Sequence, residues 1–204
     1  MKHFYLLLVC HFLLLTNLIA QEAKLFDSVS FYGSLRAHIA AYPQTVEMQN
    51  NGSRIGFNLE SRHMQGFKAE GRLELGVNLL KNNNSFKADH STADNPSAYL
   101  VETVKPFTTR LGYLGLSHPK YGSLRIGKQW GVYYDVTGCT DMFNVFGGNA
   151  SGTYNTGTDG GGEGTGRAES SIVYRKNFKN LSTGLQIQIP GHSFNFGMSM
   201  VYKL

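Results

Sequence analysis

The sequence predicts an all-β fold, an antiparallel transmembrane β-barrel. Three observations support this prediction: the chain begins like an exported protein, apolar and polar residues alternate along most of it, and its connections alternate between short and long. A period of two is the pattern of strands with one apolar and one polar face. In a membrane barrel the apolar face meets lipid, the polar face lines the interior, and short turns at one rim oppose long loops at the other.

The start of the chain has the composition of a secretory signal peptide. A short polar start precedes an almost wholly apolar run over residues 4–15, and Ala20 offers a small residue at the cleavage point, with Ala23 as an alternative. The apolar run is too short for a spanning helix and no second one follows. We therefore expect residues 1–20 to be removed and residues 21–204 to form the barrel domain, in contact with the lipid of an outer membrane.

The charge and the cysteine content exclude several classes of function. The chain has 19 basic and 14 acidic residues, and the signal peptide holds one basic residue and no acidic one, which leaves a net charge of +4 with histidine neutral. The basic residues are spaced singly rather than in the blocks of nucleic-acid-binding arms, so no nucleic-acid partner is expected. After cleavage Cys139 is the only cysteine, and no histidines have metal-ligand spacing. No cofactor, metal or catalytic activity is expected.

Eight alternating runs follow the signal peptide, and no segment predicts a helix. The predicted strands cover residues 28–42, 54–62, 67–79, 109–117, 122–129, 169–178, 181–189 and 193–204. Short breaks between them read as hairpin turns, at residues 61–66, 118–122, 177–181 and 190–192. The remaining connections read as longer loops, at residues 42–53, 80–107 and 130–168.

The two faces of these strands decide between a membrane barrel and a secreted soluble β-sandwich. The polar face carries several bulky charges in one strand, for example Lys68, Glu70, Arg72 and Glu74, and the apolar face includes several glycines and alanines. That apolar face is thin for a packed core but acceptable against lipid. The barrel is therefore favoured, and a sandwich that stays in solution without detergent is the alternative.

The longest loop, residues 130–168, is unusual in its composition. Loops of this length in a compact domain are usually functional or disordered. Its first half is aromatic and apolar, which disordered segments seldom are. Such a loop is expected to fold into the barrel, with Trp130, Tyr133 and Tyr134 packing its base against the wall and Asp135 anchoring it.

Several segments resemble the trimeric general porins of the Gram-negative outer membrane. The resemblance covers nearly all of the mature chain, through the strands near residues 29–33, 53–60, 109–116 and 121–129, and it fades after Asn177. Its most specific part is Gly131-Val-Tyr-Tyr-Asp-Val-Thr-Gly-Cys-Thr-Asp-Met-Phe-Asn-Val-Phe-Gly-Gly148, which matches the constriction loop of that family in length and order.

The resemblance implies a homotrimer of water-filled channels for the passive diffusion of ions and small hydrophilic solutes. It also implies that acids on the inward loop face basic residues of the barrel wall, which bias the passage of ions. Arg54, Arg110 and Arg167 fall on three matching arginine positions of that wall, and Asp141 falls on one of two loop acids.

The sequence departs from the family pattern at two of these positions. The second loop acid falls on Val145, and the family's first-strand lysine falls on Ser34. Arg36, on the same face as Ser34, is a candidate secondary lumen charge together with Arg125 and Glu163. With one matched loop acid against three arginines, the constriction is expected to favour cations less than its relatives do, unless Glu163 or Asp159 supplies the missing charge.

The strand number is the main difficulty for this interpretation. Porins of this family close with about sixteen strands, and eight are predicted here. The simplest account is that the chain is the first half of such a barrel. Residues 195–202 resemble the last strand of a barrel, so a complete small barrel or two chains closing one remain alternatives. Because the interior of an eight-stranded barrel is filled by side chains, the alternative function is a non-conducting barrel that binds a ligand or partner through its long loops.

Overall fold

The computed structural model describes residues 26–42, 45–80, 84–87, 100–103, 105–142, 165–191 and 194–203. The predicted signal peptide, residues 1–20, lies outside the described residues. So do residues 143–164 of the predicted constriction loop, including Val145 and Glu163.

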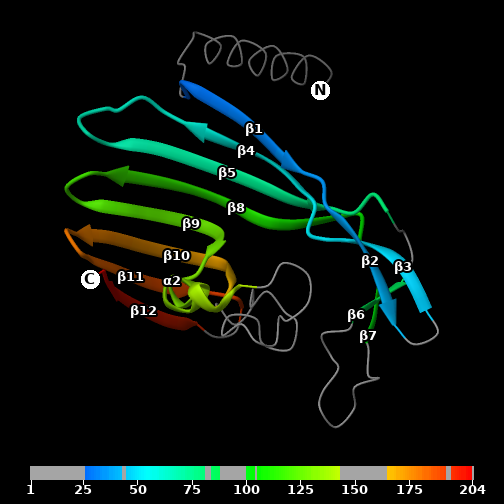
Figure 1. Ribbon diagram of the computed structural model, residues 1–204. Helices are drawn as coiled ribbons and strands as arrows, with labels where there is room; N and C mark the ends of the chain where they lie inside the picture. Colours follow the sequence, from blue (N-terminus) through cyan, green and yellow to red (C-terminus); the bar gives the residue numbers. More distant parts are fainter. Residues whose placement is uncertain are drawn as a thin grey trace, which may run out of the picture.

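Eight strands form one antiparallel sheet in the order β1-β4-β5-β8-β9-β10-β11-β12 (Figure 1). The strands are β1 (Ser28–Ser34), β4 (Arg54–Glu60), β5 (Lys68–Val77), β8 (Phe107–His118), β9 (Gly122–Trp130), β10 (Arg167–Phe178), β11 (Leu181–Gln188) and β12 (Asn195–Tyr202). The predicted all-β, antiparallel architecture with eight strands in one sheet is confirmed. β1 and β12 are the two edges of this sheet, and within the described residues they do not pair with each other, so the sheet is open.

Two small hairpins lie where the sequence predicted a continuous strand and two loops. The first predicted strand divides into β1 and β2 (Ala37–Tyr42), and β2 pairs with β3 (Thr45–Asn50). The second hairpin joins β6 (Asn84–Lys87) to β7 (Leu100–Thr103). The alternation of residue types continues across the break after Ser34, so it gave no sign of a boundary there. Strands of four residues are too short to establish a period.

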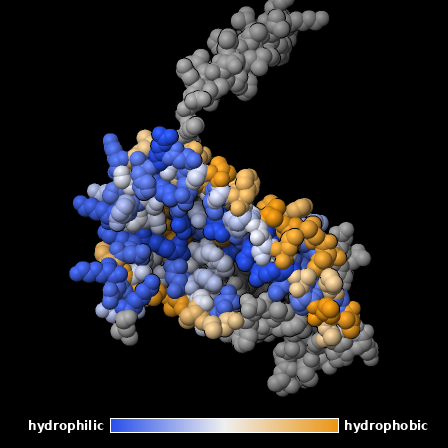
Figure 2. Space-filling model, turned by 45° about the horizontal axis from the view of Figure 1, so that its top comes forward, coloured by the Kyte–Doolittle hydropathy of each residue, from blue (hydrophilic) through white to orange (hydrophobic). Residues whose placement is uncertain are grey.

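The outer face of the sheet is apolar and exposed. Phe31, Leu114 and Met198 are 82%, 65% and 75% exposed, although they belong to three different strands of one sheet. Figure 2 shows hydrophobic residues along one margin of the molecule, opposite a hydrophilic side. Large apolar side chains exposed in such numbers require an apolar surrounding, and lipid provides it.

A soluble sandwich would need a buried apolar core, and the described residues contain almost none. Their buried apolar side chains are Ala40, Val77, Leu111, Val132, Ala168 and Val173. Several polar side chains are buried instead, among them Glu74, Gln129 and Gln188. This inverted distribution excludes the sandwich and agrees with a membrane sheet.

A short helix, α2 (Val132–Thr137), and a 3-10 turn, η2 (Gly138–Thr140), follow β9 directly. The expectation that the chain contains no helix is therefore wrong. Six residues make fewer than two turns, which is too short for a helical period to show in the sequence. The helix packs against β11 and β12 (Figure 1). No helix among the described residues is both long and apolar enough to cross a membrane.

Candidate functional site

A buried carboxylate organises the basic side chains of the polar face. Glu74 on β5 is 3% exposed. Its carboxylate accepts hydrogen bonds from Tyr32 Oη at 2.7 Å, from Arg110 Nε at 2.8 Å and from Arg72 Nη2 at 3.2 Å. The Arg72 guanidinium also donates to Tyr32 Oη at 2.9 Å and lies 5.0 Å from the centre of the Tyr32 ring. Two guanidinium groups around one carboxylate leave a fixed, net positive cluster.

An irregularity in β8 directs Arg110 into this cluster. Thr109 pairs with Leu75 and Leu111 pairs with Glu74, so Arg110 is the extra residue between the two pairs. A β-bulge of this kind changes the direction of a side chain and is frequent beside functional sites. A second irregularity, in β10 between Ala168 and Ser171, follows the predicted wall residue Arg167 by one position.

Arg54 and Arg110 share the polar face on either side of β5. Arg54 pairs with Ser34 on one side and with Gly76 on the other. A Cβ atom on Gly76 would lie 3.3 Å from Cδ of Arg110, so the arginine stem extends over this glycine toward β4. The structure thus places these two predicted wall arginines near each other. Arg36 instead donates from Nη2 to the carbonyl of Gly52 at 3.2 Å, at the base of the β2–β3 hairpin.

Arg167 and Asp141 are linked through two stacked aromatic rings. The Arg167 guanidinium lies 5.4 Å from the centre of the Trp130 ring, and the Trp130 and Tyr134 rings stack with centres 4.0 Å apart. Tyr134 Oη donates a hydrogen bond to Asp141 Oδ2 at 3.2 Å. Burial raises the pKa of Tyr134, and the neighbouring Asp141 carboxylate raises it further. At neutral pH Tyr134 is therefore a protonated donor to the loop acid.

The anchoring role expected for Asp135 is confirmed. Its Oδ2 atom lies 2.8 Å from Arg175 Nε and accepts a hydrogen bond from Ser199 Oγ at 3.3 Å. Arg175 Nη2 also donates to the carbonyl of Trp130 at 2.8 Å. No sequence pattern singles out Arg175 or Ser199, because their meeting depends on the register of three strands. Their position on the polar side of alternating strands was the only available signal.

The secondary lumen charges fall into different settings. Arg125 on β9 pairs with Glu70 on β5 at 2.6 Å, and its guanidinium lies 5.0 Å from the centre of the Tyr113 ring. Arg125 is thus on the polar face but already neutralised. Glu70 and Glu74, the acids that offset this wall, were not among the predicted site residues. Glu163 lies outside the described residues.

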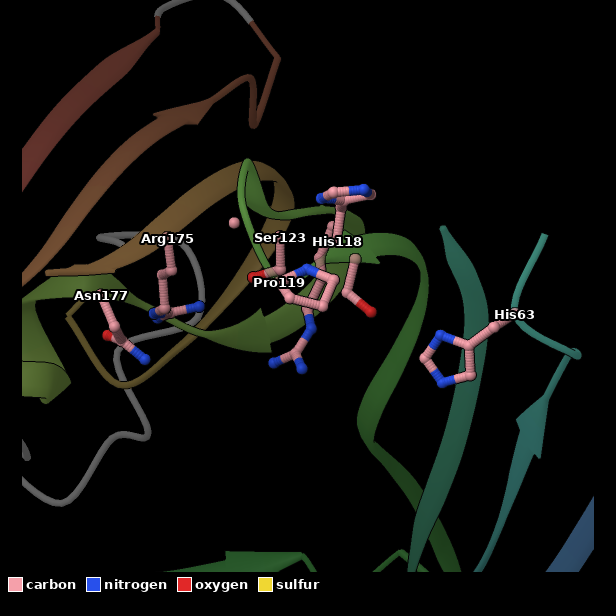
Figure 3. Close-up of a pocket in the computed structure, with 9 residues that line it drawn as sticks. His63, His118, Pro119, Ser123, Arg175 and Asn177 are labelled. Carbon is pink, nitrogen blue, oxygen red and sulfur yellow. The ribbon is translucent and has the colours of Figure 1, made fainter. Parts of the chain in front are cut away.

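The polar face also borders a cavity of about 500 Å³ beside the turns that join β4 to β5 and β8 to β9. Figure 3 shows Arg175, Asn177 and Ser123 around this cavity, with His63 on a separate segment of the chain. No group of three or more histidine, cysteine, aspartate or glutamate side chains in the described part of the chain could hold a metal ion. The arrangement is a water-accessible, charged wall.

Known proteins resemble the chain in sequence and in fold. Residues 16–193 match the family described as Gram-negative porin. Outer membrane protein F of Serratia marcescens is 41% identical over 92 residues, which cover 44% of this chain and 23% of that protein. Outer membrane porin F of Xenorhabdus nematophila is 28% identical over 177 residues, which cover 83% of this chain and 42% of that protein.

Solved structures of outer-membrane proteins are similar to the chain in fold. The complex of Salmonella typhi OmpF with daunomycin has a TM-score of 0.59 at 23% identity, and the match covers 86% of this chain and 50% of that one. The trimer form of OmpT, an outer membrane protein of Vibrio cholerae, has a TM-score of 0.54 at 20% identity, over 80% of this chain and 41% of that one. The chain spans about half the length of these structures, and less than half the length of the sequence relatives.

Proposed function

Because the chain belongs to the Gram-negative porin family, we propose that it walls a water-filled channel for the passive diffusion of ions and small hydrophilic solutes across the outer membrane. One observation carries this proposal: the sheet has an exposed apolar outer face and a charged inner face on which a loop helix rests. Charged side chains on a concave inner surface hold water, which a filled barrel would exclude. The relatives are named as porins, and the proposal is for a channel rather than an enzyme.

The selectivity of the channel would come from Arg54, Arg110 and Arg167 opposite Asp141. The contacts of Arg110 with Glu74 and of Tyr134 with Asp141 support this proposal, because they hold one charge of each sign in a fixed place. Opposed charges across a narrow pore bias which ions enter. Since Glu74 neutralises part of the basic cluster and Val145 replaces the second loop acid, we propose weak ion selectivity rather than strong cation preference.

The assembly that we propose is a homotrimer in the outer membrane. One structural neighbour is described as a trimer, and porin homologues are outer-membrane proteins. The partners of such an assembly are membrane lipid, two further copies of the chain, and the ions and solutes that pass.

Reconstitution into planar lipid bilayers tests the proposed function. The protein purified from the outer membrane should give steady conductance proportional to voltage, with a small reversal potential in a potassium chloride gradient. A membrane-inserted protein without conductance would overturn the channel and favour a filled barrel that binds a partner through its loops. A large reversal potential of the sign for potassium would leave the channel but overturn the proposed weak selectivity.

A further inference from the structure

The inner face of β10, β11 and β12 forms a fitted surface for α2. We call Arg175, Gly184, Gln186, Gly197 and Ser199 the α2 seat. Two cross-strand rows build it, since Gly184 pairs with both Arg175 and Ser199, and Gln186 pairs with Gly197. Partners in such rows project to the same face of a sheet.

The first row receives Asp135. Its carboxylate lies over Gly184, where an added Cβ atom would be 3.2 Å from Asp135 Oδ2 and 2.6 Å from Ser199 Oγ. Arg175 and Ser199 bind that same carboxylate oxygen from the two sides of the glycine. Only a residue without a side chain at Gly184 leaves room for this arrangement.

The second row receives Val132, the first residue of the helix. Val132 is 1% exposed, and its backbone N–H donates to Gln186 Oε1 at 2.9 Å. An added Cβ atom on Gly197 would be 2.7 Å from Val132 Cγ2. The hydrogen bond from Val132 to Gln186 satisfies one of the free N–H groups at the helix start, where Gly131 provides no side-chain cap.

Arg175 is the member of the seat that contacts both the helix and the residue at the base of the loop. Its Nε atom binds Asp135, and its Nη2 atom binds the carbonyl of Trp130, the last residue of β9. A guanidinium presents these donors in a rigid plane, which an ammonium group does not. Arg175 also lines the cavity of the polar face (Figure 3), so the ion pair stands beside the proposed solute path.

We propose that Arg175, through the α2 seat, is the positioning residue that sets where the constriction loop stands in the channel. Fixing Asp135 fixes its helical neighbour Tyr134, which holds Asp141 by a hydrogen bond. The position of the loop charge is thus set by β10–β12, on the wall beside Arg167, and not by the basic cluster of β5 and β8. This inference rests on the proposed channel function.

Variants of the full-length protein in planar bilayers test the role of Arg175. Arg175→Lys keeps the charge but cannot hold both partners in one plane, and Gly184→Ala displaces Asp135 while every charge remains. Both are expected to raise the open-channel current noise severalfold and to lower the voltage at which the channel closes. Because every charge remains, the sign of the reversal potential should not change. The matched control is Arg62→Gln, which removes a paired charge that bonds Asp27 at 2.6 Å without touching α2, and it should leave the noise at the wild-type level.

Two results would overturn the proposal. One is wild-type noise in both Arg175→Lys and Gly184→Ala, and the other is noise in the Arg62→Gln control as high as in those two variants. Amide hydrogen exchange of residues 131–142 in detergent provides a second readout that needs no conduction. Arg175→Lys should speed this exchange severalfold relative to wild type and to Arg62→Gln, and unchanged exchange would refute the positioning role. A wild-type protein that does not conduct, yet shows this change in exchange, would overturn the channel and not the seat.

Discussion

Glu74 is the residue on which the basic cluster depends. A carboxylate that is 3% exposed is stable as an anion only because Arg110, Arg72 and Tyr32 surround it with donors. The same contacts prevent the two guanidinium groups from moving freely on the polar face of the sheet. A buried acid therefore determines where the positive charge of this wall lies.

Replacing this carboxylate should destabilise the protein and make the proposed pore more basic. Glu74→Gln leaves two guanidinium groups without their shared anion, and the loss of a charged hydrogen-bond partner at a buried site costs about 1–3 kcal/mol. Unfolding by urea in detergent measures this change, and the reversal potential should move toward anion preference. Glu60→Gln is the control, because Glu60 pairs with Lys68 at 2.7 Å with its side chain 46% exposed. An exposed pair contributes less than about 1 kcal/mol, so equal losses in the two variants would contradict this account.

Asp141 carries the loop charge that the resemblance singled out. Asp141→Asn should shift the reversal potential toward anions, because a unit charge acting over roughly 8 Å of water contributes about 0.5 kcal/mol, or about a twofold change in permeability ratio. The measurement is the reversal potential in a potassium chloride gradient. Asp27→Asn removes an equal charge that pairs with Arg62 at 2.6 Å, at the far end of the sheet from the loop, and should leave the potential unchanged. An Asp141→Asn channel with wild-type potential would show that this carboxylate does not face the ion path.

At the scale of single elements, the strands could be predicted and the helix could not. The alternation of apolar and polar residues is a local property of each strand, so the eight strands of the sheet could be predicted from the residues alone. The helix is held by contacts that are distant in the sequence, such as the bond from Val132 to Gln186, 54 positions away. No local pattern of six residues contains that information. The division between β1 and β2 was also hidden, since the alternation of faces is the same on both sides.

Some residues of the candidate site could be predicted from the sequence, and others could not. Arg54, Arg110, Arg167 and Asp141 could be named only from the resemblance, since scattered charges on one face look alike. Their partners Glu74 and Arg175 depend on which residues stand opposite each other across the sheet. Register of this kind is set by turns and by bulges such as that at Arg110, which periodicity does not reveal.

The close fit of α2 to its seat predicts that a side chain added at Gly197 destabilises the protein. Gly197→Ala places a methyl group 2.7 Å from Val132 Cγ2, and overpacking of this kind typically costs about 1–3 kcal/mol. The expected result is a lower urea midpoint. Gly112→Ala is the matched control on the outer side of the sheet, because its Cβ atom would meet Thr109 and Leu73 at 3.7 Å and 3.8 Å, which are ordinary contact distances. A Gly197→Ala protein as stable as the Gly112→Ala control would contradict the fitted seat.

For the molecule as a whole, the apolar outer face must be covered by lipid. Leu114 projects from β8 on this face and is 65% exposed. Leu114→Arg should reduce the free energy of unfolding in lipid vesicles by about 2–4 kcal/mol, the usual cost of an arginine that faces the middle of a bilayer. Ser123→Arg adds the same side chain on the polar face of the next strand, where water is available, and should cost far less. Comparable losses for the two variants would mean that the outer face does not lie in lipid.

The order of strands in the sheet has a consequence for biogenesis. Apart from the two small hairpins, each strand of the main sheet pairs with the strand that follows it in the chain. Pairing of chain neighbours closes short loops, which keeps contact order low and favours rapid folding. The sheet can therefore be built by successive addition of hairpins at a membrane surface. The outermost strands, β1 and β12, contain no charged residue and no proline that would protect a free edge. Until each edge acquires its neighbour, it can pair with strands of other chains, so export in water should require a chaperone that shields it.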